Sequence, residues 1–338
     1  MQSAEKQPVA DIALSERVTL PAEALARTKA LDRFRLGDAV FRHLTRAAAL
    51  GVLLLLSGVI VSLIDGSIPA FRAFGLGFLT SERWNPVTEI FGALPAIYGT
   101  IVTSIIAMVI AVPVGLMIAF FLTELCPQWA RRPIGIAVEL LAGIPSIIYG
   151  IWGLFMFAPF LQRTLQPFLI DTFGDMPVLG VLFAGPPYGI GILTSGLVLA
   201  IMVLPFVTSI SRDVFEAVPG VLKEAAYGVG CTRWEVVRFV VLPYARVGVI
   251  GGIMLSLGRA LGETMAVTFV IGNAHRISAS ILAPGTTISA SIANEFTEAV
   301  GDLYTSSLIA LGLILFVITF IVLAIARYML MRIERRIG

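Results

Sequence analysis

The stretch "EAAYGVGCTRWEVVRFVVLP" at residues 224–243 limits the folds that this chain can adopt. It begins with residues that favour a helix, and Gly230 then permits a sharp turn. A second amphipathic segment follows at 232–241, and we expect its helix to stop before Pro243. The stretch therefore predicts a hairpin of two short helices.

Long apolar segments lie on both sides of this hairpin and recur along the chain. Hydrophobic residues make up 57% of the sequence and charged residues 14%, with a mean hydropathy of +0.92, whereas soluble domains contain about 25% charged residues. Six segments are long enough to cross a bilayer as helices: 47–64, 94–123, 134–160, 189–210, 244–272 and 304–327. The sequence predicts an all-α, polytopic membrane protein with six transmembrane helices.

The basic residues are concentrated on one side of this arrangement. Nineteen Lys and Arg residues fall in the N-terminal segment, the loops after spans two and four, and the tail, whereas four fall in the opposite loops. Positively charged loops stay in the cytoplasm. Both termini and the loop 211–243 are therefore expected to be cytoplasmic.

The N-terminal segment 1–46 is polar, with no apolar stretch typical of a cleaved signal peptide. Segment 47–64 is therefore expected to be an uncleaved anchor. Apolar and basic residues alternate in 31–46, which indicates either an amphipathic helix on the inner membrane surface or a solvated lead-in. The transmembrane core is expected at 94–327 and a cytoplasmic tail at 328–338.

The spacing within the hairpin resembles the EAA loop of ABC importer permeases. The matching positions are Glu224, Ala225, Ala226, Gly230, Val240, Leu242 and Pro243, with Val240 where isoleucine is commoner. The resemblance implies a type I ABC importer permease (MetI-like) core, with a coupling helix that docks into a cytoplasmic ATPase. The alternative is a plain connecting hairpin.

The chain has no G-x-x-x-x-G-K-[ST] phosphate-binding loop. We therefore expect no cofactor on this chain, with ATP and Mg²⁺ used by a separate ATPase. No metal-binding or nucleophile constellation lies within the spans, so neither a metal site nor an enzyme is expected.

Four further stretches resemble permeases of the phosphate-specific transport (Pst) system, of the subunit type called C. They are "FLTSERWNP" at 78–86, "GALPAIYGTIVTS" at 92–104, "GIPSIIYG" at 143–150 and "GRALGETMAVTFVIGN" at 258–273. The resemblance implies phosphate import across a bacterial inner membrane. It also implies a heterodimer with an A-type permease subunit, an ATPase dimer, and a periplasmic or lipid-anchored phosphate-binding protein. Membrane lipid is expected around the chain, and nucleic acid is not an expected partner.

Two ionisable residues, Arg259 and Glu263, fall inside the expected fifth span. A charge at the bilayer centre costs about 2.5–3.5 kcal/mol on insertion scales, so such residues often mark a substrate pathway. On a continuous helix the two lie one turn apart on one face. We expect Arg259 to bind dehydrated phosphate, and Glu263 to hold Arg259 in the empty site and accept a hydrogen bond from protonated phosphate. The alternative is an ion pair that only stabilises the span.

Small and hydroxylated residues surround this pair. Ser256, Thr264 and Thr268 either line the pathway or bond their own helix backbone. The glycine pairs Gly248/Gly252 and Gly258/Gly262 allow close helix packing, either against a second permease subunit or within this chain.

The sequence is also compatible with other functions. One is an ABC permease for another oxyanion, such as phosphonate, sulfate or molybdate; another is a gradient-driven secondary transporter. His275 beside Arg276 either attracts anions or is an ordinary interfacial pair.

Overall fold

The computed structural model describes residues 22–177 and 179–334. These residues form helices and connecting loops, with one isolated antiparallel β-bridge between Asn85 and Ile90. The chain divides into two compact units, Met1–Val61 and Ser62–Gly338, which are described separately.

A single helix, α1 (Ala22–Phe74), occupies the described part of the first unit and enters the second. The segments 31–46 and 47–64 are parts of this one helix, and it continues about three turns beyond residue 64. Side chains from residue 37 to Val61 are almost all exposed. Membrane contact by 31–46 stays a prediction, and residues 1–21 lie outside the described part.

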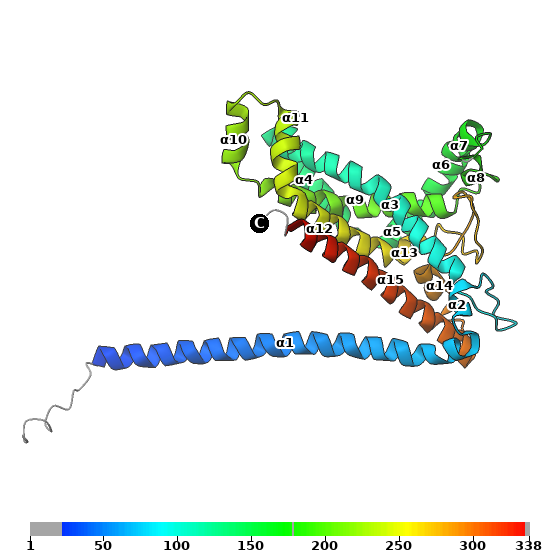
Figure 1. Cartoon of the computed structure of the whole chain (residues 1–338), viewed down its shortest axis with the longest axis horizontal. Helices are drawn as coiled ribbons and strands as arrows, with labels where there is room; N and C mark the ends of the chain where they lie inside the picture. Colours follow the sequence, from blue (N-terminus) through cyan, green and yellow to red (C-terminus); the bar gives the residue numbers. More distant parts are fainter. Residues whose placement is uncertain (1–21, 178, 335–338) are drawn as a thin grey trace, which may run out of the picture. The chain divides into compact units, whose positions relative to one another are not determined.

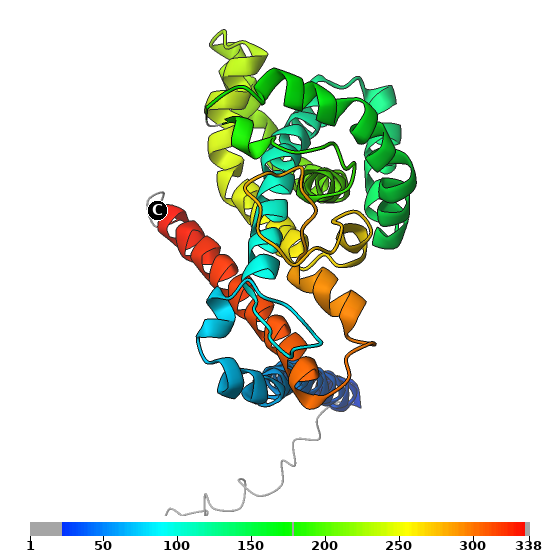
Figure 2. The same ribbon diagram turned by 90° about the vertical axis from the view of Figure 1, so that its right-hand side faces the viewer.

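The second unit is built on four long helices: α3 (Leu94–Phe120), α9 (Ile192–Glu216), α12 (Leu242–Leu261) and α15 (Asp302–Glu334). Helix α9 is central, and 72% of its most apolar 18-residue stretch is buried inside the structure. Figure 2 shows it nearly end-on, with α3 in cyan and α12 in yellow beside it, and Figure 1 shows α15 running along α12. Small residues permit this packing: a Cβ on Gly196 of α9 would lie 2.6 Å from Ile106 of α3.

The shorter helices connect and flank these four. They are α2 (Gly77–Thr80), α4 (Gln128–Ala142), α5 (Ser146–Trp152), α6 (Ala158–Arg163), α7 (Leu165–Phe173), α8 (Leu179–Leu182), α10 (Gly220–Gly228), α11 (Arg233–Val236), α13 (Met265–Thr268) and α14 (Ile288–Glu295).

Five helices in the described residues are long and apolar enough to span a membrane, and a bent pair makes a possible sixth. The bent pair takes the place of the third span. The expectation of one continuous helix at 134–160 is therefore wrong. Between α4 and α5 the chain bends by 88°. Pro145 is extended there, with ψ of 136°, and a proline disfavours helical geometry at the residue before it. The "GIP" at 143–145 thus breaks the span.

Three π-helical turns each precede an X-Pro pair. They are η1 (Phe121–Leu125) before Cys126-Pro127, η2 (Gly153–Phe157) before Ala158-Pro159, and η3 (Val237–Val241) before Leu242-Pro243. In each, the residue before proline donates its N–H to the carbonyl five residues back. At η3 this wider turn lets the helix continue past a residue without an N–H. The expected stop before Pro243 is therefore wrong: one helical path runs from Arg233 to Leu261.

Candidate substrate pathway and coupling hairpin

The fifth span ends earlier than residue 272. Helix α12 stops at Leu261, and Gly262 caps it by donating its N–H to the Gly258 carbonyl. Arg259 therefore lies in the last turn, and Glu263 lies in the break before α13. The expectation that both share one face of a continuous mid-span helix is wrong, because glycine is a poor helix former and a frequent C-terminal cap.

Arg259 contacts an aromatic ring rather than a carboxylate. Its guanidinium carbon lies 4.2 Å from the centroid of the Phe206 ring of α9, and the residue is otherwise exposed. A cation over a ring face is attracted by the ring quadrupole, and the C-terminus of a helix favours a positive charge. Within 22–177 and 179–334, no ion pair joins Arg259 to an acidic residue.

Glu263 makes a local contact instead. Its Oε1 accepts a hydrogen bond of 3.3 Å from the backbone N–H of Ala266 in the first turn of α13. In this state Glu263 does not hold Arg259, contrary to the expectation. It offsets one of the unpaired N–H groups at the start of that short helix.

The three hydroxyl residues differ in their surroundings. Thr268 donates to the Thr264 carbonyl at 2.7 Å, and Thr264 donates to the Gly262 carbonyl at 3.4 Å, so both bond nearby backbone. Ser256 is buried and its hydroxyl has no protein partner in the structure. A role for these residues in lining the pathway stays a prediction.

The structure distinguishes the two glycine pairs. A Cβ on Gly248 would lie 2.7 Å from Val214, and one on Gly252 would lie 2.6 Å from Ile210, both on α9. The first pair therefore packs within this chain. A Cβ on Gly258 would lie 3.5 Å from Leu323 of α15, which is an ordinary van der Waals distance. A Cβ on Gly262 would approach only atoms of its own helix.

The sequence stretch 224–243 contains the predicted first helix and turn, while the second helix continues past Pro243. Helix α10 has no buried residue, and Gly230 has a φ of +91°, which L side chains rarely adopt. The Thr232 side chain and Glu235 form a capping box that starts α11. We call the residues from Gly220 to Val236 the coupling hairpin.

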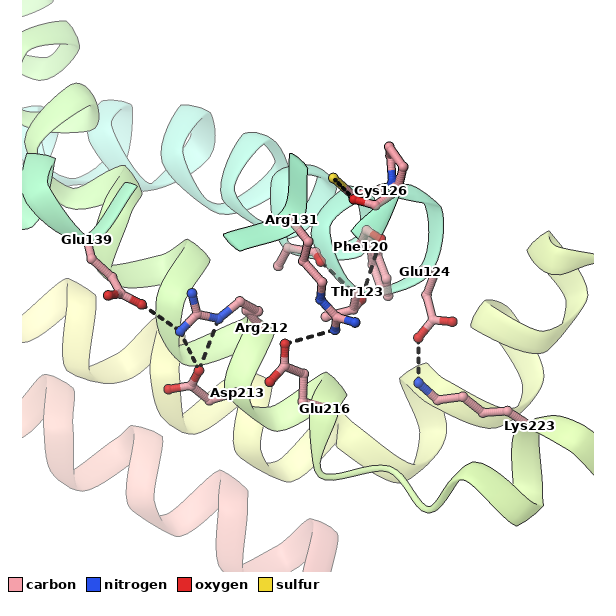
Figure 3. Close-up of polar contacts among 12 residues, drawn as sticks. Phe120, Thr123, Glu124, Cys126, Arg131, Glu139, Arg212, Asp213, Glu216 and Lys223 are labelled. Carbon is pink, nitrogen blue, oxygen red and sulfur yellow. Dashed lines mark hydrogen bonds and ion pairs between the residues drawn. The ribbon is translucent and has the colours of Figure 1, made fainter. Parts of the chain in front are cut away.

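Ion pairs gather beside the coupling hairpin, around the end of α9 (Figure 3). They are Arg131–Glu216 at 2.9 Å, Arg212–Glu139 at 2.8 Å, Arg212–Asp213 at 2.9 Å and Lys223–Glu124 at 2.6 Å. The first two link α4 to α9, so they hold half of the bent pair against the central helix.

A polar cluster lies at the other end of the second unit. His275 Nε2 is 2.6 Å from Glu295 Oε1, while Glu295 Oε2 accepts hydrogen bonds of 2.7 Å from Trp84 Nε1 and from the Tyr304 hydroxyl. The Trp84 and His275 rings stack with centroids 5.0 Å apart. His275 is therefore a mostly buried partner of Glu295, and a role of His275 and Arg276 in attracting anions stays a prediction.

Two opposing effects act on the Glu295 carboxyl. Burial alone would raise its pKa, but the hydrogen bonds from His275 and Tyr304, the His275 charge and the Trp84 hydrogen bond together hold the pKa below its ordinary value. Sequence reasoning missed this cluster because Trp84 and Glu295 are 211 residues apart.

Comparison with known proteins identifies the family. The sequence model described as "Binding-protein-dependent transport system inner membrane component" matches residues 111–335, which include the coupling hairpin and Arg259. The chain belongs to this family. It is thus a membrane permease component of ABC importers and not itself an enzyme, as the EAA-loop resemblance predicts.

Relatives of this permease share most of its length. The "Phosphate transport system permease protein PstC" of Mesorhizobium japonicum is 70% identical over 319 residues, which cover 94% of this chain and 98% of that protein. The protein of the same name from Pasteurella multocida is 57% identical over 301 residues, covering 89% and 94%. The predicted resemblance to C-type phosphate permeases is confirmed.

Solved structures support the fold of this permease. A chain of a bacterial ABC transporter for import of the acidic polysaccharide alginate matches with a TM-score of 0.58 and 16% identity, covering 88% of this chain and 99% of that one. A second structure of the alginate transporter, in complex with its pentasaccharide-bound periplasmic protein, gives 0.55 at 15% identity, covering 86% and 97%. At these identities the likeness concerns the fold alone.

Proposed function

We propose that this chain is the transmembrane permease subunit of an ATP-driven importer of inorganic phosphate. The observation that carries the proposal is the 70% identity, over nearly the full length, to the phosphate transport permease of Mesorhizobium japonicum. The four stretches that resemble Pst permeases agree with it. The chain would form part of the translocation pathway in a bacterial inner membrane.

The energy for import would come from separate subunits. A permease of this kind works with a second permease subunit, here an A-type subunit in a heterodimer, and with a dimer of ABC ATPases that uses ATP and Mg²⁺. A phosphate-binding protein, periplasmic or lipid-anchored, would deliver the substrate. The exposed α10 of the coupling hairpin suits a helix that docks into an ATPase, because none of its residues is buried in this chain.

Orientation follows from the charge asymmetry. The coupling hairpin and the Glu295 cluster lie at opposite ends of the second unit, α10 and α14 in Figure 1. With the basic loops in the cytoplasm, α10 would face the cytoplasm, the Glu295 cluster would face the binding protein, and both termini would be cytoplasmic.

Arg259 is the residue proposed to meet the substrate. A guanidinium is permanently charged and presents a planar fork that matches two oxyanion oxygens. Phe206 positions this group without neutralising it, so the charge stays available to dehydrated phosphate. Ser256, Thr264, Thr268 and Glu263 are proposed as further pathway residues.

Uptake of labelled phosphate by the co-expressed complex in proteoliposomes tests this function. Phosphate should enter only with ATP and binding protein present, and excess sulfate, molybdate or phosphonate should not compete. Competition by one of these would favour the runner-up, a permease for that oxyanion. Uptake without ATP hydrolysis would contradict the proposal.

A further inference from the structure

The coupling hairpin is attached to the rest of the second unit by few contacts. Ala226 and Cys231 pack against an apolar cluster that includes Phe215 and Val241. Among the described residues, its polar attachment is the Lys223–Glu124 ion pair, with 2.6 Å between Nζ and Oε1. Figure 3 shows the side chains of Lys223 and Glu124 pointing toward one another.

This ion pair is unusually sequestered. The side chain of Glu124 is 9% exposed and that of Lys223 is 19% exposed, the lowest combined exposure among the Lys and Arg ion pairs of the described residues. Glu124 borders an apolar cavity of about 450 Å³ whose walls include Phe120, Phe121 and Trp234. A part-buried carboxylate beside apolar walls is stabilised by a close charged partner, because it keeps little hydration of its own.

Glu124 lies on a distinctive backbone segment. It belongs to η1, the π-helical turn that continues α3, and α3 packs along the central α9. π-Helical turns are frequent at functional sites and interrupt the regular hydrogen-bond ladder. The pair thus joins the coupling hairpin to the end of a span that contacts the centre of the bundle.

The neighbouring ion pairs do not make this connection. Arg131–Glu216 and Arg212–Glu139 both link α4 to α9 and involve no residue of the coupling hairpin. They serve as matched controls, because they lie in the same region with similar chemistry.

We propose that Lys223 and Glu124 are positioning residues that transmit displacement of α10 to the end of α3. The proposal rests on the proposed function, in which an ATPase moves α10. Helix α10 is flanked by Pro219 and by Gly230, which has a left-handed conformation. Without a charged contact at Lys223, these turns would absorb movement of α10 before it reached the spans.

The test is the number of phosphate ions imported per ATP hydrolysed by the full complex in proteoliposomes. Glu124→Gln and Lys223→Met should each lower this ratio by about fivefold or more, the lower end of typical coupling between sites, with ATP hydrolysis retained. Lys223→Arg and the charge-swapped Glu124→Lys/Lys223→Glu double variant should recover much of it. Arg131→Gln should leave the ratio near the wild-type value.

The outcomes separate this inference from the proposed function. If the wild-type complex imports no phosphate, the proposed function fails. If the wild type imports phosphate and the single variants keep its ratio, the inference alone fails. It fails too if the swapped variant and Lys223→Arg assemble, by co-purification, yet stay as uncoupled as the single variants. If a single variant does not assemble, the phosphate-to-ATP ratios of the swapped variant and of Lys223→Arg test the inference instead.

Discussion

Arg259, in the last turn of α12, lies over Phe206 of the central helix α9, with 4.2 Å between its guanidinium carbon and the ring centroid. Such contacts contribute about 0.5–1 kcal/mol when exposed and about 2 kcal/mol when desolvated. A carboxylate partner would compete with an incoming anion for the guanidinium, whereas a ring face leaves the fork of N–H donors free at its edge. The contact therefore suits a group that must be held in place and still bind an oxyanion.

Replacing the ring should weaken phosphate handling without abolishing it. Phe206→Leu keeps an apolar side chain but removes the ring face, so phosphate uptake efficiency should fall about two- to fivefold, which corresponds to the exposed contact. Phosphate uptake efficiency should fall much further in Arg259→Gln, because the charge itself is lost. Uptake by proteoliposomes measures both, with Phe168→Leu, an exposed phenylalanine on α7, as the matched control. Wild-type uptake by Arg259→Gln in an assembled complex would exclude a pathway role for this residue.

A side chain at Gly230 should strain the turn of the coupling hairpin. Its φ of +91° strains any L residue, and Gly230→Ala should destabilise the chain by about 1–2 kcal/mol. Gly228→Ala is the control, because its Cβ would meet open space and its backbone is helical. Thermal unfolding of the purified complex in detergent compares the two. Equal melting temperatures would show that the turn relaxes easily.

The stability supplied by Glu295 should depend on pH. Burial raises the pKa of this carboxyl, but the hydrogen bonds and charge of its partners outweigh burial and lower the pKa below 4.5. Because the folded pKa is depressed, the stabilisation is fully present above the unfolded pKa and is lost as pH falls through the folded pKa.

Glu295→Gln should therefore lower the melting temperature at neutral pH, and the difference from wild type should shrink as the pH falls below about 4.5. Glu298→Gln is the control, a nearby carboxyl outside the hydrogen-bonded cluster. Melting curves of the complex across acidic and neutral pH provide the measurement. A difference that stays constant with pH would mean that the carboxyl has the same pKa in the folded and the unfolded chain, which would contradict the lowered pKa.

Much of the fold could be predicted from local sequence, because apolar length is a local property. Spans two, four and six follow from their apolar runs, and the coupling hairpin follows from its fixed spacing and Gly230. The break at Pro145 could have been inferred from "GIP" at 143–145, since the residue before a proline resists helix. Conversely, Pro243 looks like a helix stop, and only the π-helical turn before it explains why the helix continues.

The candidate site was less predictable. A four-residue spacing implies contact only if the helix continues, and α12 ends between Arg259 and Glu263. The partner that Arg259 contacts, Phe206, lies on another helix, and the partners of Glu295 come from three separate segments. Such contacts depend on tertiary packing, which no local pattern encodes.

The glycines of α12 should separate intrachain packing from packing against other subunits. Gly252→Ala places a Cβ 2.6 Å from Ile210 and should destabilise the chain by about 1–3 kcal/mol through overpacking. Gly251→Ala, one residue away, meets no atom of this chain within 4 Å and should be neutral or slightly stabilising in the isolated chain, because alanine favours helix. Melting temperatures of the purified single chain, and then of the assembled complex, give two readings for each variant. A loss of assembly by Gly251→Ala alone would place the second permease subunit against this side of α12, whereas an unaffected Gly252→Ala chain would contradict the close contact between α12 and α9.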